Sequence, residues 1–385
     1  MSFEFCHWDF YENNTQMVKQ RSSKPDTILM GVIFMLLVFG LVMISSAGIV
    51  LSQTKFGDEY YFFKHQLAYG VVPGLLILFV TQKINYKFWK KLAVPFFFFA
   101  LLLLVLVLIP GLGMRFQGAS RWLSLGPISF QPSEAMKLAI ILYLALWIES
   151  RGRRLKDFFE GFLPFAIIVG VIGFLIMKQP DMGTLGSIIM IAMVMFFASG
   201  APLSFIALMA GGGAAMAVLL VKLEPYRMDR LTTFLDPGAD PQGIGYQINQ
   251  ALLAIGSGGI FGLGLGHSRQ KYNYLPEPIG DSVFAIVAEE LGMVGAVFLL
   301  TLFVLFALRG YKIAQNAPDE FGRLVAIGIT SWIIFQSIIN IMAIVGLIPL
   351  TGIPLPFISY GSTSLVFVLA GVGILLNISK HSKVD

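Results

Sequence analysis

The chain has 385 residues, of which 56% are hydrophobic and 13% are charged, with a formal net charge of +5. This composition leaves too little polar surface for a soluble globule of this size, so a water-soluble protein is excluded. Apolar runs of about 20 residues recur, and a bilayer requires every backbone polar group of a span to be satisfied internally, which favours helices over a barrel. We predict an all-α polytopic membrane protein.

The apolar runs, taken in chain order, predict one membrane domain over residues 28–378 with about ten spanning helices. The preceding segment, residues 1–27, lacks the basic flank and short apolar core of a cleaved signal peptide, so the first span is expected to be retained. The predicted spans are residues 28–51, 65–81, 92–110, 133–149, 161–177, 184–199, 203–221, 282–308, 323–348 and 358–378.

Clusters of lysine and arginine indicate which side of the membrane each connection faces. They lie at residues 19–24, 83–91 and 151–156, and the positive-inside rule places them in the cytoplasm together with both termini, including the tail 379–385. Stretches rich in glycine, proline and polar residues follow odd-numbered spans and are therefore expected outside. They include a long extracytoplasmic loop at about 223–281.

Some outward segments contain cations where this rule expects few. Either long loops escape the rule, or these cations meet an anionic ligand such as a lipid-linked phosphate at the headgroup level. In another outward segment, Arg115, Arg121 and Trp122 could contact phosphate and sugar, although Trp122 is equally typical of an anchor at the membrane interface. The cations of the long loop are Arg227, Arg230, Arg269 and Lys271.

The sequence does not support several common kinds of site. Cys6 is the only cysteine and the four histidines are scattered, so neither an intramolecular disulfide nor a metal site is predicted. The glycine-rich stretch 256–266 lacks the strand, helix and acid of a dinucleotide fold, and no phosphate-binding GxxxxGK[ST] motif occurs. We identify no cofactor and no nucleic-acid partner, so the energy for any reaction must arrive with the substrate.

The stretch 274–292, YLPEPIGDSVFAIVAEELG, places carboxylates beside and inside an apolar helix. If a helix begins near Asp281, then Ala285, Ala288 and Gly292 fall within about 40° of it, and the carboxylate lies above a face of small side chains. Such a face admits a neighbouring helix or a ligand. Asp281 is therefore either a helix N-cap or a functional acid at the hydrocarbon edge.

Other ionisable residues lie inside or beside predicted spans. Glu289 and Glu290 are expected to be structural, satisfied by neighbouring helices. Glu134 and Lys137 are three residues apart on one helical face and are expected to pair. The pair either orients its helix or holds a charge-balanced cation for phosphate. Asp181 is more typical of a helix cap than of a ligand, although it shares the outward position of the other candidates.

Four stretches together resemble the shape, elongation, division and sporulation (SEDS) family, also called the FtsW/RodA/SpoVE family. They are the run from YRMDRLTTFLDP to VAEELG and the motifs RWLSLGPISFQPSE, KQPDMGT and GIPLPFISYGSTS, in order over nearly the whole chain. YRMDRLTTFLDP and LGHSRQKYNYLPEP are most similar to the division-type FtsW branch. The resemblance implies a peptidoglycan glycosyltransferase that polymerises lipid II, the undecaprenyl-pyrophosphate disaccharide pentapeptide, at the outer face of the bacterial cytoplasmic (inner) membrane. It also implies a class B penicillin-binding protein and other divisome membrane proteins as partners.

The resemblance also implies roles for residues at matching motif positions, with Asp281 as the essential acid. Where relatives commonly have histidine, threonine, aspartate and phenylalanine, this chain has Ile279, Gly280, Asp281 and Ser282, so no role is carried over for that histidine or threonine. Ser362 replaces a glycine usual in the family. The substrate-binding candidates at matching positions are Glu134, Lys137, Trp122, Gln179, Asp181, Ser359 and Tyr360, to which we add Arg121, Gln131, Lys271 and Glu277. Pro356 and Gly361 also match the PFISYG motif of the family.

In the expected reaction Asp281 is the base for a sugar C4 hydroxyl that attacks C1 of a second disaccharide with inversion. Lys137 and Arg121, with Arg227 or Lys271, would neutralise the departing pyrophosphate, and a divalent cation could share that task. The alternatives are a lipid II flippase, a RodA-type elongation polymerase and a scaffold for division proteins. A flippase needs polar residues through to the cytoplasmic half, whereas these motifs cluster at one face, which favours an enzyme.

Overall fold

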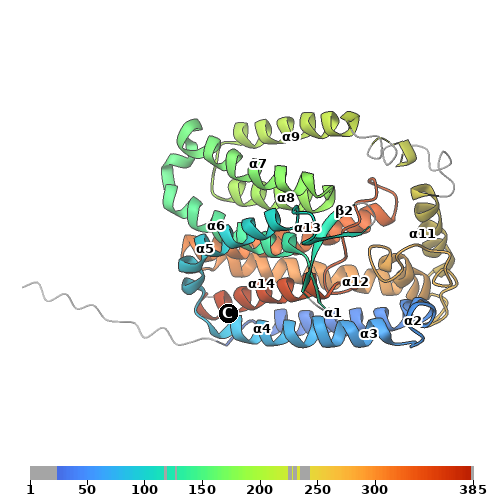
Figure 1. Ribbon diagram of the computed structural model, residues 1–385. Helices are drawn as coiled ribbons and strands as arrows, with labels where there is room; N and C mark the ends of the chain where they lie inside the picture. The colour runs from blue at the N-terminus through green and yellow to red at the C-terminus, as the bar shows by residue number, and fades with distance from the viewer. Residues whose placement is uncertain are drawn as a thin grey trace, which may run out of the picture.

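The computed structural model describes residues 24–116, 119–125, 128–223, 228, 232–234 and 243–382. Within them, long helices run side by side and form a bundle, while a small sheet and the short helix α2 lie near one end of it (Figure 1). The predicted polytopic helical fold is confirmed. The small sheet was not predicted.

Helical segments in the described residues follow the ten predicted spans in order. Seven segments are long and apolar enough to cross a membrane, and the number of spans beyond these seven stays a prediction. The seven are α1 (Thr27–Ala47), the continuous stretch of α3 (Tyr61–Gln66), η1 (Leu67–Val71) and α4 (Val72–Lys83), α5 (Tyr86–Leu106), the stretch of η3 (Phe158–Phe162) and α7 (Leu163–Lys178), α12 (Val283–Gln315), α13 (Glu320–Ile344) and α14 (Ser362–His381).

Three further predicted spans correspond to helices that are less apolar or shorter than the seven above. Helix α6 (Pro132–Arg151) carries four charged residues, and 15 of its 20 residues are buried by other helices. Helix α8 (Met182–Ala198) has only 17 residues, which cover about 26 Å at 1.5 Å per residue. In α9 (Leu203–Leu223) the apolar part is Leu203–Met216. The protein surrounds α6, so its charges need not face lipid.

The two ends of the described chain lie together. The backbone N–H of Asp26, just before α1, donates to Ser379 Oγ near the end of α14 at 3.1 Å. Arg309 of α12 also pairs with Asp26, at 2.5 Å. Both ends therefore lie at the same end of the bundle, as an even number of spans requires. That this end faces the cytoplasm stays a prediction.

A three-stranded antiparallel sheet lies near the other end of the bundle (Figure 1). Its strands are β1 (Gly113–Phe116), β2 (Ala119–Leu125) and β3 (Ile128–Phe130), paired in chain order. Strands of three to seven residues give an alternation too short to distinguish from a loop, which is why sequence reasoning missed them. The sheet leads directly into α6.

The predicted continuous span 282–308 is wrong in one respect, because α12 is broken at Gly292 (φ 64°, ψ −164°). The carbonyls of Glu289 and Glu290 accept from the backbone N–H groups of Leu263 and Gly264, at 2.9 and 3.0 Å, instead of from the next helical turn. The N–H groups released beyond the break donate back to the same glycine-rich stretch, 256–266. This stretch therefore completes the backbone hydrogen bonds of a broken helix.

Close backbone contact explains the glycines of this stretch. A Cβ on Gly258 or Gly262 would overlap the carbonyl oxygen of Ala288 or of Glu290, and Gly262 also has φ 80°. A further helix, α11 (Ile244–Gly258), precedes it within the predicted loop 223–281 and packs against α12. The loop therefore contains a helix that sequence reasoning missed.

Candidate active site

Asp281 lies in the turn before α12. The N-cap is Ser282 and makes no side-chain capping hydrogen bond, so the alternative of Asp281 as an N-cap is wrong. The predicted face of small residues beneath Asp281 assumed one regular helix from Asp281 onward. It does not apply, because α12 begins at Val283 and breaks at Gly292. Ala288 instead lies against Gly258 at the end of α11, so the small face accommodates a neighbouring segment of the chain.

The turn that carries Asp281 is held by the segment before α14. Ser359 Oγ donates to the carbonyl of Gly280 at 2.6 Å, and the backbone N–H of Tyr360 donates to the carbonyl of Ile279 at 2.8 Å. Ser359 Oγ also accepts from the N–H of Leu355 at 2.8 Å. The structure thus places Ser359 and Tyr360 next to the turn of Asp281, as expected for residues of one site. Their hydrogen bonds support the backbone of this turn.

Two amide side chains that sequence reasoning missed also contact this turn. Gln247 of α11 has its Nε2 3.4 Å from Asp281 Oδ1 and 3.0 Å from Ser282 Oγ. Asn340 of α13 donates from Nδ2 to the backbone carbonyl of Asp281 at 2.8 Å. Both residues are far from Asp281 in the sequence, and single-sequence patterns carry no signal for such a contact.

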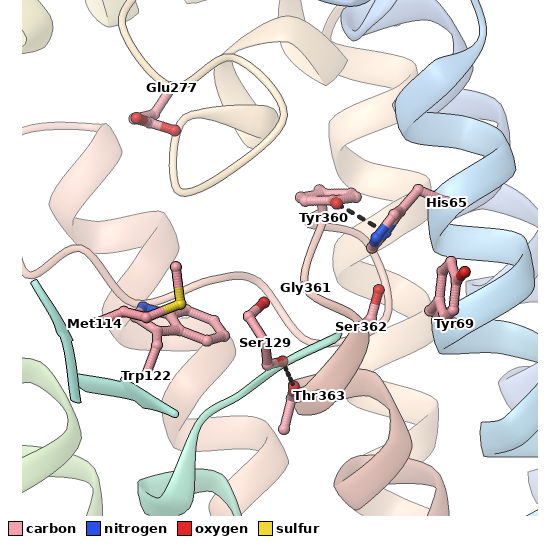
Figure 2. A pocket seen from close by; sticks show the side chains of 10 residues that line it. All are labelled: His65, Tyr69, Met114, Trp122, Ser129, Glu277, Tyr360, Gly361, Ser362 and Thr363. Carbon is pink, nitrogen blue, oxygen red and sulfur yellow. Dashed lines mark hydrogen bonds between the residues drawn. The ribbon is translucent and has the colours of Figure 1, made fainter. Parts of the chain in front are cut away.

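A pocket of about 450 Å³ opens beside this turn (Figure 2). Trp122, Glu277 and Tyr360, three of the predicted substrate-binding residues, line it. Asp281 does not line the pocket but follows Glu277 by four residues. The other lining residues are His65, Tyr69, Met114, Ser129, Gly361, Ser362 and Thr363.

Aromatic rings and hydroxyl groups dominate the pocket. Tyr360 OH and His65 Nδ1 are 2.9 Å apart, and burial raises the pKa of Tyr360 to about 12, so the hydroxyl stays protonated and can donate to the imidazole. Glu277 is the only charged residue among those that line the described pocket. Its backbone is left-handed (φ 47°), an uncommon conformation for glutamate that is typical of functional turns.

The predicted pair of Glu134 and Lys137 is confirmed, with Lys137 Nζ 2.8 Å from Glu134 Oε1. Lys137 also donates to Gln336 Oε1 at 2.9 Å, and its side chain is 1% exposed. The ammonium group is thus enclosed by its partners and does not line the pocket. Direct neutralisation of a pyrophosphate by Lys137 does not fit this arrangement.

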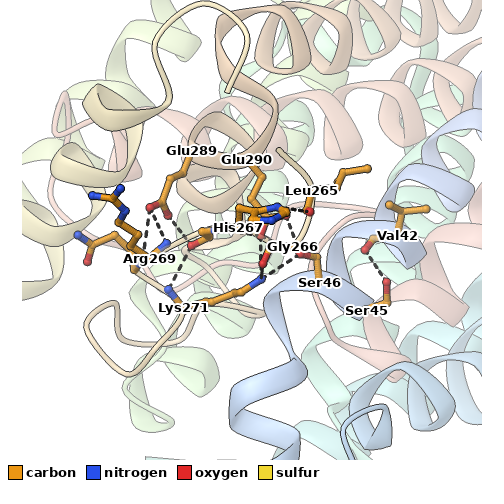
Figure 3. A network of polar contacts seen from close by, with 12 residues as sticks. Val42, Ser45, Ser46, Leu265, Gly266, His267, Arg269, Lys271, Glu289 and Glu290 are labelled. Carbon is orange, nitrogen blue, oxygen red and sulfur yellow. Dashed lines mark hydrogen bonds and ion pairs between the residues drawn. The ribbon is translucent and has the colours of Figure 1, made fainter. Parts of the chain in front are cut away.

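Lys271 belongs to a second buried ion pair, with Glu290 at 3.0 Å (Figure 3). Its Nζ also donates to the carbonyl of Gly266 at 2.7 Å and lies 3.4 Å from Ser46 Oγ of α1. Because the side chain is 1% exposed, the expected contact of Lys271 with pyrophosphate does not fit either.

Glu289 and Glu290 are structural, as predicted, but the segment after the glycine-rich stretch supplies many of their partners (Figure 3). Glu289 accepts from Ser268 Oγ at 2.5 Å and from the backbone N–H of Arg269 at 2.9 Å. Glu290 accepts from Ser46 Oγ at 2.6 and 2.8 Å. The two acids therefore fix the course of the chain toward Asp281.

The remaining candidates connect the sheet to the turn between α7 and α8. Arg121 donates to the carbonyls of Gln179, at 3.3 Å, and Pro180. Gln179 is fully buried and donates to Leu104 of α5 at 3.1 Å. Asp181 caps α8 through the N–H of Thr184 at 3.1 Å, which confirms its expected role as a cap.

Gln131 precedes α6 as its N-cap residue and makes no side-chain capping bond. Arg227 and Arg230 lie outside the described residues, as does the side chain of Arg115. Among the described residues, no group of three or more histidine, cysteine or acidic side chains could hold a metal ion.

The fold and the polar site at one end of its bundle define a polytopic helical membrane protein with a candidate active site in irregular backbone between helices. The chain belongs to the FtsW/RodA/SpoVE family of cell cycle proteins, whose model matches residues 26–384.

Named relatives agree with this membership. Stage V sporulation protein E of Bacillus subtilis strain 168 is 44% identical over 366 residues, which cover 94% of this chain and 99% of that protein. A probable peptidoglycan glycosyltransferase FtsW of Trichlorobacter lovleyi is 41% identical over 365 residues, covering 94% of this chain and 95% of the relative.

Solved structures share the fold. One chain of a peptidoglycan synthase complex, described as coordinating polymerization and crosslinking, is 30% identical with a TM-score of 0.77, over 94% of this chain and 99% of that one. RodA, the rod shape determining protein of Thermus thermophilus, is 29% identical with a TM-score of 0.68, over 94% and 98% of the two chains.

Proposed function

We propose that this chain is a peptidoglycan glycosyltransferase that polymerises lipid II at the outer face of the cytoplasmic membrane during cell division, together with a class B penicillin-binding protein. One observation carries the proposal: the turn with Asp281 is held by α11, α13 and the segment before α14, directly beside the aromatic pocket. Relatives named as probable peptidoglycan glycosyltransferases, and a structural neighbour from a peptidoglycan synthase complex, support it.

The pocket suits the saccharide part of such a substrate. Trp122 and Tyr360 offer aromatic faces for sugar rings, and Ser129, Ser362 and Thr363 add hydroxyl groups or backbone beside them (Figure 2). Glu277, its only charged lining residue among those described, would repel a pyrophosphate. We therefore assign the pocket to the disaccharide and place the lipid pyrophosphate outside it.

In the proposed reaction the C4 hydroxyl oxygen of one disaccharide attacks C1 of another. The new bond between oxygen and C1 forms on the face opposite the bond to the lipid pyrophosphate, which breaks with its electron pair on the leaving group. The carboxylate of Asp281 takes the hydroxyl proton, so Asp281 is the catalytic residue. No covalent sugar intermediate with the protein is needed.

Among the cations proposed for the leaving group, Arg121 keeps this role. It is only partly buried, and its two carbonyl contacts leave further guanidinium N–H donors for phosphate oxygen. Lys137 and Lys271 are enclosed in ion pairs instead.

The test is polymerisation of labelled lipid II by purified protein with its penicillin-binding partner. Wild type should form glycan chains and Asp281→Asn none, because the amide cannot accept the proton. Asp58→Asn is the matched control: it removes an exposed carboxylate that pairs with Lys64 at 2.8 Å, and polymerisation should remain normal. Polymer from Asp281→Asn would overturn the assignment of the base. Flipping of lipid II into the outer leaflet by both forms, without polymer from either, would support the transporter.

A further inference from the structure

Two buried amide side chains on α13, Gln336 and Asn340, lie one helical turn apart on the same face. Each donates to one carbonyl of the irregular segment that follows the helix. Asn340 Nδ2 lies 2.8 Å from the carbonyl oxygen of Ile353, and Gln336 Nε2 lies 2.9 Å from that of Pro354. The segment thus runs antiparallel to α13 and is attached to it at two successive residues.

At its outer end this arrangement reaches the catalytic turn. The Nδ2 of Asn340 also donates to the carbonyl of Asp281, so one amide joins that turn to Ile353. The Oδ1 of Asn340 is buried and makes no hydrogen bond within the described part of the chain. A buried acceptor without a partner costs about 1–3 kcal/mol. Because asparagine is present despite this cost, we attribute its presence to the two hydrogen bonds that its Nδ2 donates.

At its inner end the arrangement reaches the ion pair of α6. Gln336 Oε1 accepts from Lys137 Nζ and from Trp332 Nε1, both at 2.9 Å. Ammonium and indole N–H groups only donate, so both require the oxygen of the amide and leave its NH₂ for Pro354. The charge of Lys137, balanced by Glu134, therefore fixes which way the amide of Gln336 points.

We propose that Lys137 acts on the reaction through this chain of contacts and does not touch the substrate. Gln336 and Asn340 are positioning residues that hold the segment 353–354, and through it the turn of Asp281, in one place. The inference rests on the proposed function of Asp281 as the base. It assigns the buried pair of Lys137 and Glu134 a role in positioning that turn, which requires no contact with the substrate.

Gln336→Glu is the decisive variant because it keeps an oxygen for Lys137 and Trp332 but loses the donor to Pro354. Loss of one such hydrogen bond should lower kcat about tenfold, while KM for lipid II stays unchanged. Lys137→Met should give the same pattern, and combining it with Gln336→Glu should lower kcat no further. Lys83→Met, which removes an exposed lysine at the end of α4, is the control and should behave as wild type.

Direct contact between Lys137 and pyrophosphate predicts a different outcome. The two substitutions would then act independently, their effects on kcat/KM would multiply, and Lys137→Met would weaken binding of labelled lipid II to the inactive Asp281→Asn protein. Either result, or an unchanged kcat in Gln336→Glu, overturns the proposal. If Lys137→Met does not fold, as judged by thermal unfolding in detergent, Gln336→Glu alone decides, because it retains both Lys137 and Glu134. Polymer from Asp281→Asn would instead refute the assignment of Asp281 as the base, and a lack of polymer from wild type would refute the proposed function, so these failures are distinguishable from failure of the inference.

Discussion

The ion pair between Lys271 and Glu290 is buried, so breaking it should lower the free energy of unfolding by an amount that can be predicted. Lys271→Met would leave the Glu290 carboxylate, whose side chain is 0% exposed, without a cation. Hydrogen bonds from Ser46 Oγ and the N–H of Ser268 would remain. Removing one partner of a buried pair costs about 3–5 kcal/mol because the other charge stays uncompensated. We expect a loss of that size in the free energy of unfolding.

The compensating variant separates a structural role from contact with substrate. Lys271→Met combined with Glu290→Gln removes both charges and should return to within about 1–2 kcal/mol of wild type. The assay is denaturant unfolding in detergent followed by tryptophan fluorescence, with lipid II polymerisation measured on the same samples. Stability and polymerisation should recover together.

Two results would refute this reasoning. A double variant no more stable than Lys271→Met would show that the uncompensated charge of Glu290 is not the cause of the loss. A stable double variant without polymerisation would show that Lys271 meets the substrate, as the sequence alone suggested.

Three further predictions concern positions outside the ion pairs. Gly262→Ala should abolish accumulation of folded protein because its Cβ would overlap backbone, whereas Gly266→Ala, also at positive φ but facing open space, should cost only about 1 kcal/mol in thermal unfolding. Tyr360→Phe should raise KM for lipid II but leave the pH profile of polymerisation unchanged up to about pH 10, the ordinary tyrosine pKa. The reason is that burial raises the pKa of this hydroxyl to about 12, and a shifted profile would contradict it. Gln247→Leu should lower kcat about threefold to tenfold through loss of a donor to the catalytic carboxylate, and an unchanged kcat would show that this contact is idle.

Local patterns in the sequence predicted the features that depend on near neighbours. The pair of Glu134 and Lys137 was predicted because residues three apart on a helix must lie close together. The cap formed by Asp181 followed from its place at the start of a span. The positions of the long helices followed from the length of apolar runs, which a bilayer fixes independently of tertiary contacts.

The break in α12 shows why other features could not be predicted. Gly292 lies within an apolar run that has the length and composition of one continuous helix. The break is stable only because backbone groups of residues 259–264 take over the hydrogen bonds that the helix gives up. Nothing within the run itself carries that information. The glycine-rich stretch, for which sequence reasoning could only exclude nucleotide binding, supplies the missing half of the explanation.

The surroundings of Lys137 and Lys271 also depend on tertiary contacts, and they affect the mechanism. Sequence reasoning counted Lys137 and Lys271 as ligands for pyrophosphate because Lys137 lies near the outward start of a predicted span and Lys271 lies in a predicted outward loop. A cation that protein encloses away from water persists only beside an acid, and an acid that balances its charge also weakens its attraction for a second anion. Enclosure by Glu134 and Glu290 thus makes the two lysines poor phosphate ligands and good anchors for the backbone around Asp281. The charge on the leaving group must then be met by cations that remain accessible, of which Arg121 is one.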